Sequence, residues 1–191
     1  MNSTDANAPK SMSWIDHSHD TAGAFAAADA SRAVDPNLFR EAMSRLGAAV
    51  HVITTDGPHG KTGFTATAVC SVSDTPGMLL VCLNRNSGSG ALVRGNGVLC
   101  VNTLRASETD IADVFAGRTG ARAADRFQVG DWTTLKTGAP LLRTAVVAFD
   151  CRIAEVKAVA SHDVYFAIVE GVHSGEPGPA LVYHDRAYKQ V

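Results

Sequence analysis

Residues 48–69 read AAVHVITTDGPHGKTGFTATAV, two apolar segments that flank a turn at 56–60. β-branched and aromatic residues are favoured in strands, and an Asp-Gly pair is typical of a hairpin turn. The stretch therefore predicts a β-hairpin of strands 48–55 and 61–69. Segments of the same character predict further strands at 78–84, 98–104, 144–161, 163–174 and 180–184.

A helix is predicted immediately before this hairpin. Asp35 is a favourable N-cap, and Pro36 at the first helical position strengthens the signal. Apolar residues then recur at helical spacing until Gly47, which is expected to end the helix. These residues are Leu38, Phe39, Met43 and Leu46.

Two shorter helices are predicted between the strands. One covers residues 89–94, and the other follows the cap pattern Ser107-x-x-Asp110 and ends at Gly117. Mostly antiparallel strands with two or three helices predict a mainly β protein, a β-barrel with a few helices.

The composition limits the classes of function. The chain of 191 residues is 46% hydrophobic and has a formal net charge of −2. Because it has no basic stripe, nucleic acid is not an expected partner. No apolar run approaches the roughly 20 residues that span a bilayer, and the N-terminus lacks a signal-peptide pattern. We therefore expect a cytoplasmic protein with no membrane partner.

The first 34 residues differ in composition from the rest. They are rich in Ala, Ser, Asp and Asn, and so little apolar surface cannot offset the entropy of ordering. His17 and His19 are expected to be solvated there. The sequence predicts a disordered N-terminal tail at 1–34 and one folded domain at 35–191.

The cysteines and the other histidines do not form a recognisable metal site. None of Cys70, Cys82, Cys100 and Cys151 belongs to a C-x-x-C pair, and each lies in an apolar run. We expect four buried, unpaired thiols and no metal. His51 and His59 flank a turn and are expected at the surface. Because dinucleotide, phosphate-loop and nucleophile motifs are absent, an enzyme of this kind would need a cofactor.

Hydroxyl side chains are concentrated between residues 63 and 76. Successive hydroxyl residues are two or four positions apart, at Thr65, Thr67, Ser71 and Ser73. Alternation along a strand would place the first two on one face, with the serines continuing into the turn. The stretch is either an ordinary Thr/Ser-rich edge strand or a groove in which a planar ring approaches the backbone.

A second polar cluster, NRNSGSG at 84–90, precedes the short helix at 89–94. Free N–H groups at a helix start favour anions, so this segment is either a phosphate-binding corner or an ordinary polar loop.

Several blocks together resemble a known family. Five blocks occur in the order seen in flavin reductases. They are LFREAMSRLGAAVHVITTDGPHGKTGFTATAVCSVSDTP (38–76), LLVCLNR (79–85), VLCVNTL (98–104), Ser161-His162-Asp163 and Asp185-Arg186-x-Tyr188. The resemblance covers about residues 36–190. Within the family, GAAVHVITTDGP and FDCRI are most similar to the FMN reductases of pyrimidine utilisation.

This resemblance implies an FMN-binding split barrel of Greek-key antiparallel strands that forms a homodimer. It implies an NAD(P)H-dependent oxidoreductase that reduces FMN and supplies the reduced flavin, by diffusion, to a separate monooxygenase of uracil degradation. FAD and NADPH stay open as alternatives to FMN and NADH. Two other functions also stay open: a reductase serving a phenolic monooxygenase, and a non-catalytic flavin- or haem-binding barrel.

The resemblance also assigns site residues. Thr65, Ala66 and Thr67 are expected to line the flavin ring and ribityl chain. Four serines, Ser71, Ser73, Ser87 and Ser89, are candidates for the phosphate, with Asn84 near the ribityl chain. His162, the candidate catalytic residue, is expected near the flavin and the nicotinamide. It either orients the nicotinamide or supplies a proton, or it is only a polar residue in the wall of the site. Tyr188 is expected to close over the site. The sequence departs from the family pattern at Gly77, at Gly88-Ser89 and at Asp185.

Overall fold

The computed structural model describes residues 33–191, so the predicted tail lies outside the described residues except for its last two positions. Its helices are α2 (Pro36–Ser44), α3 (Gly90–Asn96), α4 (Thr109–Phe115) and the 3-10 helix η2 (Asp125–Gln128). The strands are β1 (Ala48–Ala49), β2 (His51–Thr55), β3 (Thr62–Ala66), β4 (Val69–Asp74), β5 (Gly77–Asn84), β6 (Val98–Thr103), β7 (Trp132–Thr134), β8 (Pro140–Leu142), β9 (Val147–Val159), β10 (His162–Ser174), β11 (Leu181–His184) and β12 (Ala187–Gln190).

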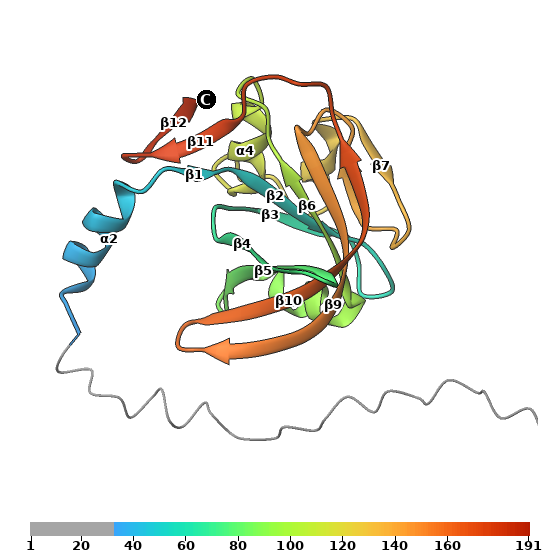
Figure 1. Ribbon diagram of the computed structural model, residues 1–191, viewed down its shortest axis with the longest axis horizontal. Helices are drawn as coiled ribbons and strands as arrows, with labels where there is room; N and C mark the ends of the chain where they lie inside the picture. Colours follow the sequence, from blue (N-terminus) through green and yellow to red (C-terminus); the bar gives the residue numbers. More distant parts are fainter. Residues whose placement is uncertain (1–32) are drawn as a thin grey trace, which may run out of the picture.

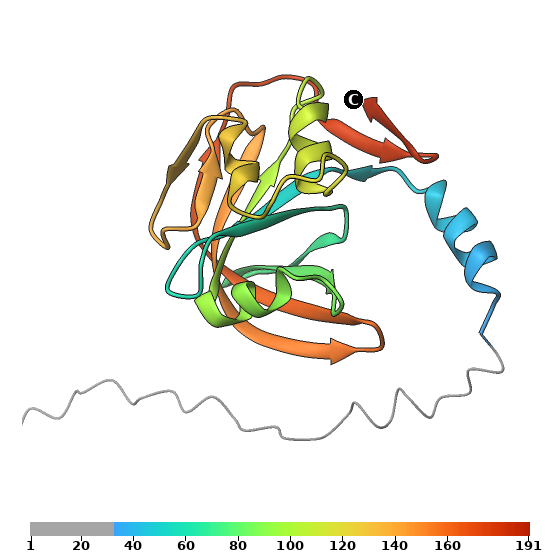
Figure 2. The same cartoon turned by 180° about the vertical axis from the view of Figure 1, so that it is seen from behind.

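Seven antiparallel strands form the main sheet in the order β3-β2-β6-β9-β10-β5-β4. β3 and β4 lie at opposite edges of this sheet, although only Thr67 and Ala68 separate them in the chain. The sheet must therefore curl until its two edges approach, as Figures 1 and 2 show. No ladder joins the two edges, so the barrel is open along this line. The predicted mainly β, split-barrel fold is confirmed.

The central strands β2 and β6 are buried on both faces because both faces are covered. Along β2, Val52 packs into one buried cluster and Ile53 into the other. The first cluster lies under α4 and the β7–β8 hairpin, and the second fills the barrel interior. The fully buried Asn102 joins the β8 hairpin to the barrel, because its amide donates to Val52 O (3.0 Å) and accepts from Leu142 N (2.8 Å).

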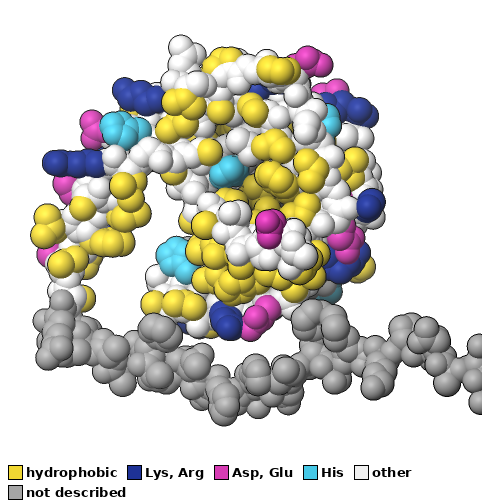
Figure 3. All heavy atoms as spheres, in the orientation of Figure 1, with side chains coloured by type: hydrophobic (Ala, Val, Ile, Leu, Met, Phe, Trp, Pro, Cys, Tyr) yellow, Lys and Arg dark blue, Asp and Glu magenta, His cyan; other side chains and the backbone are white. Residues whose placement is uncertain are grey.

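Helix α2 extends away from the barrel (Figures 1 and 3). The predicted cap is confirmed, since Asp35 Oδ1 accepts from Asn37 N at 2.8 Å and from Leu38 N at 3.1 Å. The helix ends at Ser44, earlier than the predicted Gly47. None of its residues is buried, and Leu38 is 61% exposed and Phe39 56%. The described part of the chain therefore leaves its hydrophobic side chains largely exposed.

Three sequence predictions about local structure are wrong. The predicted strand 61–69 breaks after Ala66, where the chain leaves one sheet edge for the other, so Ser71 and Ser73 do not continue the Thr65 strand. The N-cap of α4 is Glu108 instead of Ser107, and it makes no side-chain capping bond. The Glu108 carboxylate instead accepts from Arg105 N (2.8 Å) and from the Thr144 hydroxyl, both outside the helix.

The third concerns the cysteines. Cys100 and Cys151 are buried as expected, but Cys82 is half-buried and Cys70 is exposed. Cys70 lies on β4, whose outer edge has no neighbouring strand. Within residues 33–191, no helix has the length and hydropathy needed to cross a membrane.

Candidate functional site

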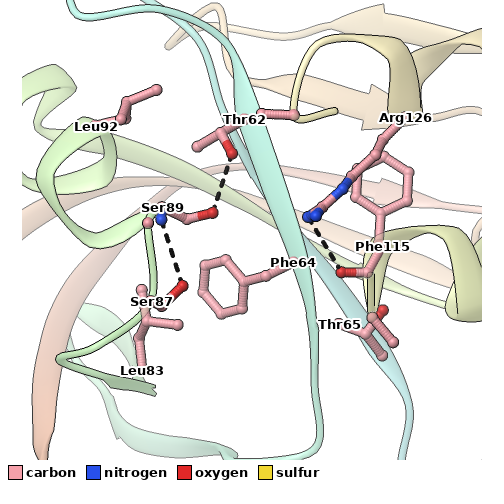
Figure 4. Close-up of a pocket in the computed structure, with 12 residues that line it drawn as sticks. Thr62, Phe64, Thr65, Leu83, Ser87, Ser89, Leu92, Phe115 and Arg126 are labelled. Atoms are coloured by element: carbon pink, nitrogen blue, oxygen red, sulfur yellow. Dashed lines mark hydrogen bonds between the residues drawn. The ribbon is translucent and has the colours of Figure 1, made fainter. Parts of the chain in front are cut away.

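A pocket of about 440 Å³ lies beside β3, one of the two edge strands of the main sheet (Figure 4). Its walls come from β3, the end of β5, the β5–α3 connection, α3, α4 and the loop around η2, so the site lies along one edge of the sheet. This volume is typical of small-molecule sites. The lining residues are Thr62, Phe64, Thr65, Leu83, Ser87, Gly88, Ser89, Leu92, Phe115, Ala116, Ala123 and Arg126.

The apolar part of the wall is held rigidly. The Phe115 ring packs against Phe127 at 5.1 Å and Trp132 at 5.4 Å between ring centroids. On its other side it lies directly over Gly63, where an added Cβ would come within 2.7 Å of Phe115 Cε1. Only glycine leaves room for the ring at this position, so β3 and α4 pack closely.

Hydroxyl groups line the opposite side of the pocket. The Thr62 and Ser89 hydroxyl oxygens are 3.0 Å apart, and Ser89 N donates to Ser87 Oγ at 3.3 Å. A Cβ added at Gly88 would meet no atom within 4 Å, so this position faces open space. This side can therefore offer hydrogen bonds to a bound molecule without rearranging the fold.

Arg126 is the one charged residue among those lining the pocket, and the sequence analysis did not assign it. Its Nη1 donates to Gly63 O at 2.9 Å and to Phe115 O at 3.5 Å, and its Nε donates to Ala121 O at 3.3 Å. Figure 4 shows it across the pocket from Ser87 and Ser89. The sequence signal was an Arg-rich loop at 118–126, but nothing in the sequence indicated that this loop folds onto β3.

Three of the predicted binding residues lie together in this pocket: Thr65, Ser87 and Ser89. The Thr65 hydroxyl donates to Ala112 O at 2.7 Å, so it joins β3 to α4. Ala66 follows on the inner face of β3, and Thr67 is exposed in the link to β4.

Two predicted residues form a cross-strand pair beyond this pocket. Asn84, at the end of β5, is directly opposite His162 of β10. His162 is half-buried, and its Nδ1 lies 2.9 Å from the Ser161 hydroxyl. β5 leads into the segment with Ser87 and Ser89, so the pair lies along the strand that leads to the pocket.

The remaining predicted residues do not line this pocket. Ser71 and Ser73 are exposed on β4, and Ser73 Oγ accepts from Thr75 N (3.1 Å) within the turn. Tyr188 packs against α4, and its hydroxyl donates to Asp113 Oδ1 at 3.0 Å. Burial, together with this hydrogen bond, raises the pKa of Tyr188 to about 12.

His51 is not the surface residue that the sequence suggested. It is half-buried on the inner face of β2, and its Nδ1 lies 3.0 Å from the Thr103 hydroxyl. Burial lowers the pKa of His51 to about 4, so the imidazole is neutral at pH 7. The prediction for His59 is confirmed, since it is exposed.

Comparison with known proteins gives the same family as the sequence motifs. Residues 43–191 match the flavin reductase like domain. An "FMN reductase (NADH) RutF 1" of Methylorubrum extorquens is 52% identical over 83% of this chain and 78% of the relative. An "FMN reductase (NADH) RutF" of Ancylobacter novellus is 50% identical over 83% of this chain and 87% of the relative.

Solved structures agree with these relatives. A protein from Haemophilus somnus matches with a TM-score of 0.79 and 42% identity over 83% of this chain and 100% of that chain. BorF, the flavin reductase component of a bacterial two-component tryptophan halogenase, matches with a TM-score of 0.77 and 26% identity over 82% of this chain and 98% of that chain. The relatives' names carry FMN and NADH, the two cofactors expected from the motifs. The chain belongs to the flavin reductase family.

Proposed function

We propose that the chain reduces FMN with NADH and releases the reduced flavin to a separate monooxygenase that acts in pyrimidine degradation. The observation that carries this proposal is the pocket beside β3, which combines apolar walls, hydroxyls and one fixed guanidinium. It is supported by the relatives named FMN reductase (NADH) RutF and by BorF, a component that serves a second enzyme.

The residues of the pocket fit a flavin nucleotide. β3 has a neighbouring strand on one side only, so its other edge offers unpaired backbone N–H and C=O groups. Such groups can bind the polar edge of a flavin ring at Thr65 and Ala66, while Phe64 and Leu83 contact apolar parts. The hydroxyls of Thr62, Ser87 and Ser89 can bind the ribityl chain.

When bound, the flavin supplies the acceptor for the hydride of the nicotinamide, and the chain supplies position and exclusion of water. We place the nicotinamide near the pair of Asn84 and His162. The Ser161 hydroxyl fixes the orientation of the His162 ring by its contact with Nδ1, so Nε2 is the nitrogen that can meet a substrate.

We also propose that a second copy of the chain covers α2, as expected for a homodimeric reductase. A row of apolar side chains on and just after α2 is 46–61% exposed, and leaving so much apolar surface in water is unfavourable. These residues are Leu38, Phe39, Met43 and Leu46. Two contacts position the helix without covering this row: Asp185 N donates to Ser44 O at 2.6 Å, and Arg186 Nη2 lies 2.9 Å from Glu41 Oε2.

The experiment is NADH oxidation in the presence of FMN, for the wild type and for Gly88→Val. Because a Cβ at this position meets no atom within 4 Å, folding is expected to be unchanged, while the new side chain enters the pocket. FMN-dependent turnover should fall sharply at an unchanged melting temperature. If the wild type does not oxidise NADH with FMN, the function is wrong; if Gly88→Val retains full turnover, the site is wrong.

The partner is tested separately by coupling the reductase to purified oxygenases. Product formation with a uracil monooxygenase at lower reductase concentration than with a phenol monooxygenase is expected. If the phenol monooxygenase needs the same reductase concentration or a lower one, the assignment to pyrimidine degradation is contradicted.

A further inference from the structure

Helix α3 contributes one wall of the pocket, but it is too short to keep its position unaided. Leu92 of the helix and Ser87 and Ser89 of the segment before it line the pocket. Val93, on the inner side of the helix, is buried in the cluster that fills the barrel. A helix of seven residues is not stable without tertiary contacts. The contacts between α3 and the strands therefore decide where this wall of the pocket lies.

Two side-chain contacts join α3 to strand β10. Arg94 Nη2 donates to Asp163 Oδ2 at 2.6 Å. The Tyr165 hydroxyl donates to Gly90 O at 3.3 Å. Asp163 and Tyr165 are two positions apart on β10 and both are buried, so they share the inner face of the sheet. One contact is made at the first residue of α3 and the other in its second half, so together they fix the orientation of the helix against β10.

The contact between Arg94 and Asp163 is an ion pair whose two members differ in exposure. Among the ion pairs formed by residues 33–191, it alone includes a residue of α3. The Asp163 side chain is 9% exposed, whereas the Arg94 side chain is 54% exposed. A carboxylate with so little access to water is unfavourable without a partner, while a guanidinium at the surface stays solvated. The buried carboxylate therefore holds the arginine, and through it the helix, close to β10.

Contacts on the other side keep the helix attached when this ion pair is removed. Asn96 Nδ2 donates to Gly60 O at 2.8 Å, and Asn96 Oδ1 accepts from His59 N at 3.0 Å. These bonds join the end of α3 to the turn between β2 and β3. The Thr62 and Ser89 hydroxyls, 3.0 Å apart, join β3 to the residue before the helix. Loss of the ion pair should therefore loosen α3 towards β10 without releasing it from the barrel.

We propose that Arg94 is a positioning residue, whose ion pair with Asp163 preorganises the α3 wall of the pocket for flavin binding. The inference rests on the proposed function, because it concerns the same pocket. Arg94 does not itself line the pocket, so it acts only through the helix. Without the pair, the bound flavin must order this wall, which weakens flavin binding. Once the flavin is bound the wall is in place, so hydride transfer proceeds as before.

The test is steady-state reduction of FMN by NADH with full-length variants, well below their melting temperatures. Arg94→Met is expected to raise the KM for FMN about tenfold, in the range of measured couplings between contacting residues. Its kcat and its KM for NADH should change by less than about twofold, the pattern of lost uniform binding. General destabilisation would lower the active fraction, and so the apparent kcat, without raising the KM for FMN.

Three further variants make the test specific. Arg152→Met is the matched control, because Arg152 is 55% exposed, pairs with Glu170 at 2.7 Å and does not line the pocket. Arg94→Lys keeps the positive charge and has one contact to replace, so it should restore most of the FMN affinity. Asp163→Asn should raise the KM for FMN, and combining it with Arg94→Met should raise it no further.

The outcomes separate this inference from the proposed function. If Arg94→Met has the same KM for FMN as Arg152→Met, or if the effects of Arg94→Met and Asp163→Asn multiply, the positioning role is wrong. An unchanged KM for FMN in Asp163→Asn overturns it as well, even where Arg94→Met does not fold. If the wild type does not oxidise NADH with FMN, the proposed function fails and this inference fails with it.

Discussion

Replacing Gly63 by alanine should destabilise the site through one added carbon atom. The new Cβ would lie 2.7 Å from Phe115 Cε1 and 2.9 Å from Ile53 O. The ring could rotate only by disturbing its packing on Phe127 and Trp132. The carbonyl belongs to β2, which is paired on both sides, so it cannot move aside without distorting the sheet.

The magnitude follows from these two contacts. Overpacking a core position costs about 1–3 kcal/mol, and the backbone contact places Gly63→Ala near the upper end. In a chain of this size, 3 kcal/mol corresponds to a fall of roughly 6–12 °C in melting temperature. Flavin binding should weaken as well, because Phe115 forms a wall of the pocket.

The assay is thermal unfolding followed by circular dichroism, with Gly77→Ala as the matched control. A Cβ at Gly77 would meet only Val169 Cβ at 3.9 Å, an ordinary contact, so little change is expected. If Gly63→Ala melts at the same temperature as Gly77→Ala, the close packing of β3 under α4 is not a feature of the folded protein.

Three other outcomes are expected. His51 has its pKa lowered to about 4, below the unfolded value of 6.5, so its stabilising contribution is complete above pH 6.5 and is lost as the pH falls towards 4. Over that pH range the free energy of unfolding of the wild type, measured in urea, should fall by up to about 3 kcal/mol relative to that of His51→Gln. If the unfolding free energies of the two proteins change with pH in parallel, this prediction is wrong. Leu38→Glu with Phe39→Glu should give a monomer by light scattering, and an unchanged dimer would show that α2 is not the interface. Burial raises the pKa of the Cys82 thiol, so Cys82→Ser should lower the melting temperature while turnover persists, and loss of turnover at unchanged melting would refute this.

Most of the fold could be predicted from the sequence because it depends on local patterns. The hairpin turn between β2 and β3 and the cap at Asp35 are short-range signals, and both are present in the structure. The break after Ala66 could not be predicted in this way. It arises because the curled sheet requires the chain to change edges there, which is a property of the sheet as a whole and not of the residues at 66–69.

The site was predicted less completely because its parts come from distant segments. Thr65 lies within one strand and Ser87 and Ser89 follow another, and the structure brings them to one pocket. Arg126 comes from a polar loop with no periodic pattern, and its position depends on the carbonyl of Phe115 and on that of Gly63, which is 63 residues away in the chain. His51 was misplaced because one polar residue in an apolar strand does not reveal whether its face is covered.

The most direct test of the account is anaerobic turnover with a small amount of protein and an excess of FMN and NADH. If the flavin is a substrate that enters and leaves the open pocket, each protein molecule should reduce many equivalents of FMN, with equal consumption of NADH. Reduction that stops after one equivalent per chain would show a tightly held prosthetic group. No reduction at all would contradict the assignment of this pocket to flavin reduction.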